Sequence, residues 1–211
     1  MRLDHYLVKK GLVTSRSKGV HLIKTGNVIV NGKVVMKPSY NVKDYDKVEL
    51  LSKYRYVGRG GYKIESFLRD RIGCKGKSVL DIGCSIGGFS DYFLRQNASK
   101  VVAIDIASDI IDKRLLKNSR LKFFGNVDAS DEKSLRAILC GEKFDIISID
   151  ISKRSLKEIL PVASKFLKAD GFIVTLFKPQ YEGCKSVPQE EKITELMSNF
   201  ENWLRKDYII L

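Results

Sequence analysis

A glycine-rich stretch from Val79 to Phe89 (VLDIGCSIGGF) has the most specific chemical signature in this 211-residue sequence. An apolar run ends in Asp81, a tight turn follows, and a helix is expected to open at about Gly87. Glycines in such a turn permit sharp backbone bends and let a ligand approach the chain closely. A second acid, Asp105, ends the next apolar run, where its carboxylate can hydrogen-bond ribose hydroxyls. The pattern predicts a site for a nucleoside cofactor.

This turn differs from two common nucleotide-binding loops. Ser85 stands where the dinucleotide fingerprint G-x-G-x-x-G has its second glycine, and no Gly-Lys-Ser/Thr of a phosphate-binding loop follows. S-adenosylmethionine has no phosphate and fits the turn better, while a purely structural turn is the alternative. Asp128, which follows the third apolar run, is equally placed to face an adenine or to cap the next helix. The residues expected to bind the cofactor are Asp81, Gly83, Ser85, Gly87, Gly88, Phe89, Asp105 and Asp128.

The elements that must position these residues alternate along the chain. Strands are expected at 78–83, 101–106, 121–125, 144–150 and 172–178, with helices around 87–96, 109–117, 131–140 and 155–168. Continuous apolar runs are typical of a parallel sheet that helices cover on both faces. We therefore expect an α/β fold with a Rossmann-like sheet. A last helix near 190–205 and the start of a strand at 208–211 suggest that most of the antiparallel hairpin that usually completes such sheets is missing.

The first 53 residues differ in composition and pattern from the rest of the chain. Two short helical patterns precede Val28 to Val35, where β-branched runs flank Asn31-Gly32, the strongest short-range signal for a hairpin. A further strand is expected at 47–51. Basic residues greatly outnumber acids here. A whole domain with net positive charge is best explained as a binding surface for the phosphate backbone of a nucleic acid. The residues expected to bind RNA are Arg2, Lys9, Lys10, Arg16, Lys18, Lys24, Asn31, Lys33 and Arg59.

We therefore divide the chain into a small α+β RNA-binding domain at 1–53, a linker at 54–61 and a larger α/β domain at 62–211. The net charge of +13 and the pI of about 9.5 predict attraction to polyanions, either nucleic acid or an anionic membrane surface. No apolar run approaches the roughly 20 residues that span a bilayer, and no signal peptide is evident, so a cytoplasmic location and no membrane partner are expected. The four scattered cysteines are interpreted as mostly buried small side chains, and no metal site is expected.

Two sets of motifs resemble known families. The segments Arg2-Leu3-Asp4, Ser15-Arg16-Ser17-Lys18, Gly26-Asn27-Val28 and Val30-Asn31-Gly32 resemble the alpha-L, or S-four-type, RNA-binding motif. The segments Gly58-Arg59-Gly60-Gly61-Tyr62-Lys63, Asp81 to Phe89, Asp150-Ile151-Ser152 and Lys178-Pro179-Gln180-Tyr181-Glu182 resemble the TlyA-type family, often labelled hemolysin A. The catalytic domain of that family is similar to FtsJ-type ribosomal RNA 2′-O-methyltransferases. The resemblance implies an enzyme that methylates ribosomal RNA or ribosomal subunits with S-adenosylmethionine.

The same resemblance implies a Lys-Asp-Lys-Glu catalytic set. Lys63, Asp150 and Lys178 occupy its first three positions, and the fourth would lie in the terminal strand region. Lys178 would be the base, with Lys63 as a nearby cation that favours its neutral form and Asp150 orienting its amine. The alternatives are a surface role for Lys63 and a helix cap for Asp150. The family usually has Ser at the position of Gly58 and Phe at the position of Lys153.

Two other functions remain open at this stage. An RNA-binding protein with a degraded methyltransferase domain would bind the cofactor without transferring a methyl group. A membrane-active hemolysin, as the family label suggests, would need an exposed amphipathic helix, and sheet packing explains the apolar stripe near 190–205 more simply.

Overall fold

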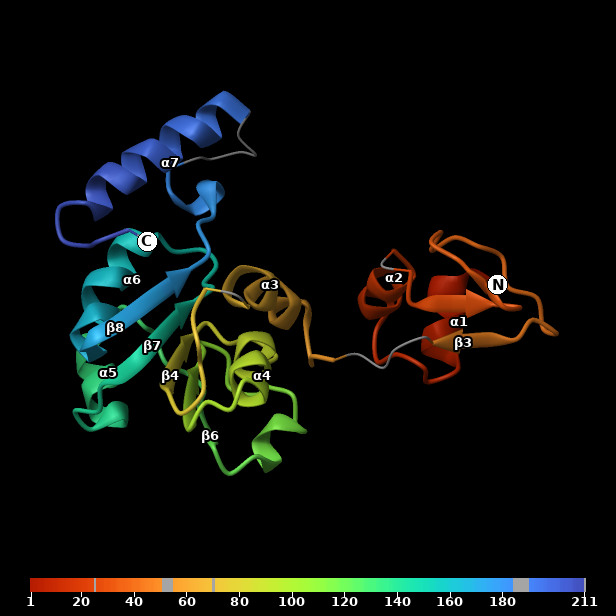
Figure 1. Cartoon of the computed structure of the whole chain (residues 1–211), viewed down its shortest axis with the longest axis horizontal. Helices are drawn as coiled ribbons and strands as arrows, with labels where there is room; N and C mark the ends of the chain where they lie inside the picture. The colour runs from red at the N-terminus through yellow and green to blue at the C-terminus, as the bar shows by residue number, and fades with distance from the viewer. Residues whose placement is uncertain (25, 51–54, 70, 184–189, 211) are drawn as a thin grey trace. The chain divides into compact units, whose positions relative to one another are not determined.

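The computed structural model describes residues 1–24, 26–50, 55–69, 71–183 and 190–210. The chain divides into two compact units, Met1–Arg55 and Tyr56–Leu211 (Figure 1). Tyr56 and Val57 are buried in the second unit, and its first helix begins at Arg59, inside the segment 54–61 that the sequence suggested as a linker.

The first unit packs two helices against a small antiparallel sheet. Its helices are α1 (Leu3–Lys9) and α2 (Arg16–Lys24), and its strands are β1 (Val28–Val30), β2 (Lys33–Val34) and β3 (Val48–Leu50), in the order β2-β1-β3. Asn31 and Gly32 both have positive φ, at 50° and 76°, as a two-residue hairpin turn of the expected kind requires. The predicted hairpin and third strand are confirmed for the described residues, and Leu51 lies outside them.

The second unit is built on a five-stranded parallel sheet of order β6-β5-β4-β7-β8. The strands are β4 (Ser78–Ile82), β5 (Lys100–Ile104), β6 (Leu121–Phe124), β7 (Phe144–Ile149) and β8 (Leu167–Thr175). The order reverses at β4, the first strand, so the connections leave in opposite directions from there. Ligands bind at such a switch point beside the carboxyl ends of the strands, and the Rossmann-like prediction is confirmed.

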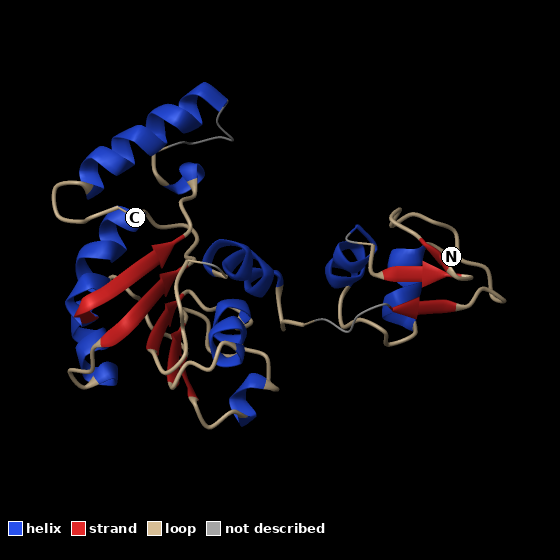
Figure 2. Cartoon of the chain, viewed as in Figure 1, coloured by secondary structure: helices blue, strands red, loops and turns tan. Residues whose placement is uncertain are grey.

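Helices cover both faces of this sheet (Figure 2). Helices α3 (Arg59–Leu68) and α4 (Gly88–Arg95) contribute to one hydrophobic core, and α5 (Glu132–Leu139) and α6 (Leu156–Ala163) contribute to the other. Helix α7 (Glu190–Leu204) packs Phe200 and Trp203 into the second core, which accounts for its apolar stripe. In the described part of the chain, no helix is long and apolar enough to cross a membrane.

Three predicted elements differ from the structure. The helix expected at 109–117 is reduced to a 3-10 turn, η1 (Leu115–Lys117). The Asp112 carboxylate accepts a hydrogen bond from the backbone N–H of Arg114 at 2.9 Å, and such local bonds compete with helix formation. The helix expected to reach 168 ends at Ala163 and is followed by the 3-10 turn η2 (Ser164–Phe166). The strand expected at 172–178 is β8, which begins at Leu167 and ends at Thr175.

Two further predictions, the strand at 208–211 and the burial of the cysteines, are corrected. Residues 208–210 form no strand, and Leu211 lies outside the described residues. Cys74 and Cys84 are buried as expected, but Cys140 is exposed. Cys140 has a φ of 50° at the carboxyl end of α5, where the chain turns out of the helix toward solvent. Cys184 lies outside the described residues.

Candidate active site

A cavity of about 500 Å³ opens where β4, β5, β6 and β7 end. Four of the residues expected to bind the cofactor line it: Gly83, Ser85, Asp105 and Asp128. Asp150 lines it as well, together with apolar side chains that include Ile106 and Ile110. The cavity therefore lies at the switch point of the sheet and combines acids from neighbouring strand ends with apolar walls.

Asp105 is held rigidly at the end of β5. One carboxylate oxygen accepts the backbone N–H of Ser85 at 2.8 Å, and the other accepts that of Ala107 at 3.0 Å. Gly83 and Ser85 have positive φ, at 76° and 51°, so the turn after β4 bends back toward this acid. The carboxylate thus fixes the turn and the loop after β5 in one arrangement, as a preorganised ligand site requires.

Asp128 does not cap α5. That position belongs to Asp131, whose carboxylate accepts the backbone N–H of Lys133 at 3.0 Å. The Asp128 carboxylate accepts the hydroxyl and backbone N–H of Ser130 at 2.7 and 2.9 Å and pairs with Arg154 at 2.6 Å. The Ser130 hydroxyl bond lowers the pKa of Asp128, and Arg154 adds to the shift, so an anion faces the cavity.

Asp81 lies behind the cavity wall. Its side chain is buried, and its carboxylate accepts the hydroxyls of Ser90 in α4 and Ser148 in β7 at 2.6 and 2.8 Å. Burial raises the pKa of Asp81 to about 6 despite these donors. Asp81 therefore links β4 to α4 and β7, and it does not line the cavity.

Gly87, Gly88 and Phe89 also lie outside the cavity lining. A Cβ at Gly87 would lie 2.4 Å from Leu115, and one at Gly88 would lie 3.0 Å from the backbone nitrogen of Gly61 in α3. Phe89 is buried in the first core. These positions therefore serve the close packing of α4 against α3 and η1. The sequence alone did not show whether they serve this packing or ligand binding.

Asp150 and Lys178 meet in the structure. The Lys178 amine forms an ion pair with Asp150 and donates hydrogen bonds to the Ile151 carbonyl at 2.7 Å and the Ser152 hydroxyl at 3.4 Å. Lys178 follows β8, and Asp150 follows β7, so neighbouring parallel strands deliver both side chains to one edge. Asp150 does not cap α6, because Ser155 occupies that position.

Lys63 takes a different place. It is exposed on α3, and among the described residues no hydrogen bond or ion pair joins it to Asp150 or Lys178. Gly58, where the family usually has Ser, precedes the same helix, and a Cβ there would lie 2.6 Å from the Ile86 side chain. The amino end of α3 thus packs against the cofactor turn.

Glu182 has a role that sequence analysis did not identify. Its two carboxylate oxygens accept the Ser155 hydroxyl and the Leu156 backbone N–H, each at 2.6 Å. It therefore caps the amino end of α6 from the loop that contains Lys178. The only sequence signal was its place in the segment Lys178-Pro179-Gln180-Tyr181-Glu182.

The residues expected to bind RNA in the first unit fall into two groups. Arg2 and Arg16 both pair with the buried Asp4, at 3.0 and 2.9 Å, and lower the pKa of that carboxyl group. Asn31 donates to Asp46 at 2.8 Å and accepts the backbone N–H of Lys47 at 2.9 Å. These three side chains are therefore engaged in contacts within the first unit. The remaining candidates in this unit have long cationic side chains: Lys9, Lys10, Lys18, Lys24 and Lys33.

Within this second group the contacts differ. Lys18 donates to the Thr14 hydroxyl at 2.9 Å, and the Lys10 amine lies 5.7 Å from the centre of the Tyr6 ring. Lys9, Lys24 and Lys33 are exposed, as is Arg59 at the start of α3 in the second unit. The exposed lysines leave their charge accessible to a polyanion.

The doubly wound parallel sheet and the acid-lined cavity at its switch point define the class of Rossmann-like methyltransferases. The FtsJ-like methyltransferase family matches residues 56–196, and the S4 domain family matches residues 1–48. The chain is 36% identical over 183 residues to Hemolysin A of Brachyspira hyodysenteriae, across 86% of this chain and 75% of that protein. It is 32% identical over 213 residues to the 23S rRNA (cytidine-2′-O)-methyltransferase TlyA of Campylobacter jejuni, across 91% and 80% of the two chains.

A solved structure of a hemolysin-type protein from Streptococcus thermophilus superimposes with a TM-score of 0.68 at 27% identity. The match covers 96% of this chain and 77% of that one. The chain therefore belongs to the FtsJ-like methyltransferase family, in its TlyA-type (hemolysin A) group, with an S4 domain at its amino terminus.

Proposed function

We propose that this protein transfers a methyl group from S-adenosylmethionine to a ribose 2′-hydroxyl of ribosomal RNA. The observation that carries the proposal is the pairing of Lys178 with Asp150 beside the cavity at the switch point of the sheet. An amine and a carboxylate next to a nucleoside site suit a transfer that needs one proton to be moved.

The cavity fits S-adenosylmethionine in size and in the chemistry of its walls. Asp105 is fixed by two backbone N–H groups, so its remaining acceptor positions can meet the ribose hydroxyls. Asp128 would accept from the adenine amine, sharing its carboxylate with Arg154. Ile106 and Ile110 supply apolar surface for the purine ring. Gly83 would keep the backbone close to the ligand, as the turn sequence predicted.

The bound cofactor would supply an electrophilic methyl group on a sulfonium. A ribose hydroxyl is a weak nucleophile, so the protein must hold it in line and accept its proton. The Lys178 amine forms an ion pair with Asp150 and donates hydrogen bonds to Ile151 and Ser152, so it is held in place beside the cavity. To act as base it must first give up one proton, and Asp150 then keeps the neutral amine aimed at the hydroxyl.

Ribosomal RNA is the substrate class that best accounts for both units. The S4 domain brings a basic surface, and the relative from Campylobacter jejuni is named for methylation of 23S ribosomal RNA at a cytidine 2′-oxygen. The exposed lysines Lys9, Lys24 and Lys33 would meet phosphates, and Lys63 and Arg59 would lie on the RNA side of the second unit.

The test is transfer of a radiolabelled methyl group from S-adenosylmethionine to ribosomal subunits that lack the modification. Label that resists alkaline cleavage next to a free 2′-hydroxyl is the expected result. If alkali releases the label from the RNA in mononucleotides, the methyl group is on a base, and the ribose assignment is overturned. Cofactor binding without any transfer would support the alternative of an RNA-binding protein with a degraded catalytic domain.

A further inference from the structure

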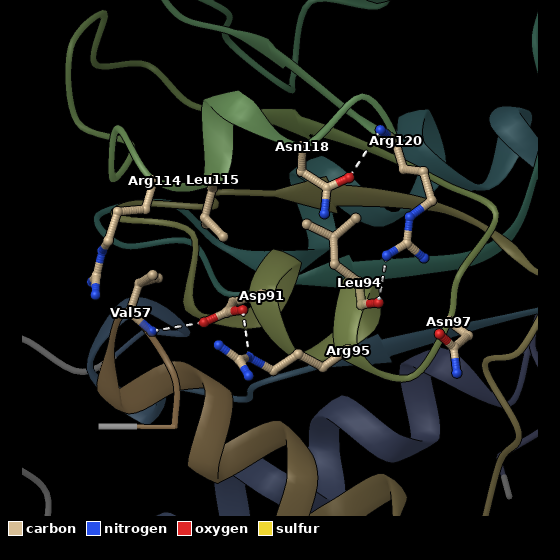
Figure 3. Close-up of a pocket in the computed structure, with 9 residues that line it drawn as sticks. All are labelled: Val57, Asp91, Leu94, Arg95, Asn97, Arg114, Leu115, Asn118 and Arg120. Carbon is tan, nitrogen blue, oxygen red and sulfur yellow. Dashed lines mark hydrogen bonds and ion pairs between the residues drawn. The ribbon is translucent and has the colours of Figure 1, made fainter. Parts of the chain in front are cut away.

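A second cavity, of about 420 Å³, lies beside α4 and the 3-10 turn η1 (Figure 3). Three arginines line it, Arg95, Arg114 and Arg120, and Asn97 and Asn118 add amide groups. Among the residues that line this cavity, Asp91 carries the one acidic side chain. The lining is therefore rich in hydrogen-bond donors and positively charged overall.

The acid in this cavity is already occupied. Asp91 is buried, and its carboxylate accepts the backbone N–H of Val57 and the Nε–H of Arg95, each at 2.8 Å (Figure 3). Because the Asp91 carboxylate bonds inward to Val57 and Arg95, it offers little to an incoming cation. The terminal nitrogens of Arg95 keep their donors for another acceptor.

Arg114 and Arg120 also have guanidinium N–H groups left for a ligand. Arg114 donates Nε and one terminal nitrogen to the Asp112 carboxylate at 2.9 and 2.7 Å. Arg120 donates one N–H from each terminal nitrogen to the carbonyls of Ala98 and Leu94, at 2.8 and 3.1 Å. A guanidinium has five N–H donors, so these bonds fix the orientation of each planar group without using it up. Planar groups with spare paired donors suit phosphate oxygens.

The surrounding chain extends this charge beyond a single anion. Residues 113–122 contain five basic side chains and no acid. Those outside the cavity lining are Lys113, Lys117 and Lys122, and all three are exposed. A run of one sign beside a donor-rich cavity is the pattern expected for a phosphodiester backbone, because neighbouring phosphates can occupy the flanking positions.

The same segment is attached to the candidate active site. Ile110 lines the cofactor cavity, while Arg114 and Leu115, a few residues further on, line the arginine cavity. The backbone N–H of Asp112 donates to the Ile86 carbonyl in the cofactor turn at 3.1 Å. RNA phosphate held here would be held by the chain segment that borders the methyl donor.

We propose that the cavity of Arg95, Arg114 and Arg120 binds a backbone phosphate of the RNA substrate. This inference rests on the proposed function only in that the substrate is RNA. It adds to the catalytic unit a contact that the S4 domain does not supply.

The test compares Arg114→Ala with Arg136→Ala in the full chain. The Arg114 side chain is 64% exposed and pairs with Asp112, and the Arg136 side chain is 60% exposed and pairs with Glu132 on α5. The two variants therefore lose equal charge and a similar ion pair, from segments that pack against different cores. Affinity for a ribosomal RNA fragment is measured over a series of salt concentrations.

Arg114→Ala is expected to weaken RNA binding by about five- to tenfold near 0.1 M salt, and to reduce the slope of log affinity against log salt by about one. The KM for RNA should rise while kcat and the Kd for S-adenosylmethionine stay unchanged, and the unchanged cofactor Kd shows that the variant is folded. Arg114→Lys should recover the salt slope. RNA binding by Arg114→Ala equal to that of Arg136→Ala would overturn the proposal.

Calorimetry with inorganic phosphate separates an RNA contact from a site for a free anion. Phosphate binding that Arg114→Ala abolishes, with RNA affinity unchanged, would assign the cavity to a small anion and overturn the RNA proposal. Loss of RNA affinity in Arg114→Ala, in a protein that transfers no methyl group, would support this inference and overturn the proposed function alone.

Discussion

At the scale of single residues, Asp81 combines complete burial with two hydroxyl donors. Burial penalises its charged form more than Ser90 and Ser148 favour it, so its pKa rises to about 6 in the folded protein from 3.8 in the unfolded chain. The folded state therefore binds this proton more tightly than the unfolded state does. The resulting stability is present below pH 3.8 and is lost as the pH rises toward 6.

Asp81→Asn should remove this pH dependence, because the amide keeps the shape and does not titrate. Between about pH 4 and pH 7 the unfolding free energy of the wild-type protein should fall by about 2 kcal/mol relative to the variant. Urea unfolding at several pH values measures the difference. A constant gap between the two proteins across this range would contradict the raised pKa of Asp81.

Lys178 is the residue on which the proposed chemistry depends. Lys178→Ala should lower methyl transfer by about 10²- to 10⁴-fold, the usual contribution of a general base, with the Kd for S-adenosylmethionine unchanged. Lys178→Arg separates two roles, because arginine can pair with Asp150 yet does not give up a proton. Single-turnover transfer near the wild-type rate in Lys178→Arg would mean that the cation only positions the substrate.

At the scale of elements, the loop after β8 is fastened to α6. Glu182 caps that helix together with Ser155, and Lys178 reaches the Ile151 carbonyl in the loop before it. Two contacts from one short segment thus hold the ends of neighbouring strands in register. The geometry of the Lys178–Asp150 pair is a property of this assembly and not of either residue.

Glu182→Ala should therefore lower kcat and leave cofactor binding unchanged. Loss of the cap should also cost about 1–2 kcal/mol of unfolding free energy. Glu182→Gln has a carbonyl oxygen for the Leu156 N–H and an amide that can donate to the Ser155 hydroxyl, so it should restore most of both. Equal damage to kcat in Glu182→Gln and Glu182→Ala would argue that the carboxylate acts directly in the reaction. Stopped-flow transfer and thermal unfolding provide the two measurements.

At the scale of the whole molecule, charge is divided unevenly between the two units. Residues 1–55 contain 12 Lys and Arg against 4 Asp and Glu, and so carry 8 of the 13 net positive charges in about a quarter of the chain. Arg2 and Arg16 direct part of this charge to the buried Asp4. The exposed lysines remain as the principal source of attraction to a phosphate backbone.

Replacing Lys9, Lys24 and Lys33 with Gln should weaken binding to a similar extent for every RNA sequence. It should also flatten the salt dependence, by about one unit of slope for each phosphate that the protein no longer neutralises. The Kd for S-adenosylmethionine should not change, since the cofactor cavity lies in the other unit. Filter binding at about 50 to 200 mM salt measures the slope. An unchanged slope would assign the RNA contacts of the first unit to other side chains.

The sequence by itself determined the two-part organisation, the order of the five strands along the chain, the hairpin at Asn31-Gly32 and the cofactor turn. These features depend on near neighbours, because periodicity, turn residues and strand ends act within a few positions of the chain. Asp105 was identifiable for the same reason, as an acid at a strand end. The wrong helix at 109–117 is the local exception, where the Asp112 side chain bonds to the backbone just after it.

Only the tertiary structure decided which chemical groups meet. It buried Asp81 behind the cavity, assigned Gly87 and Gly88 to helix packing, paired Lys178 with Asp150, and set Glu182 on the end of α6. Each of these contacts joins residues that are far apart in the chain, or depends on how tightly two elements approach. Their energies come from desolvation and close packing, which a residue acquires only when the whole sheet and its helices are assembled.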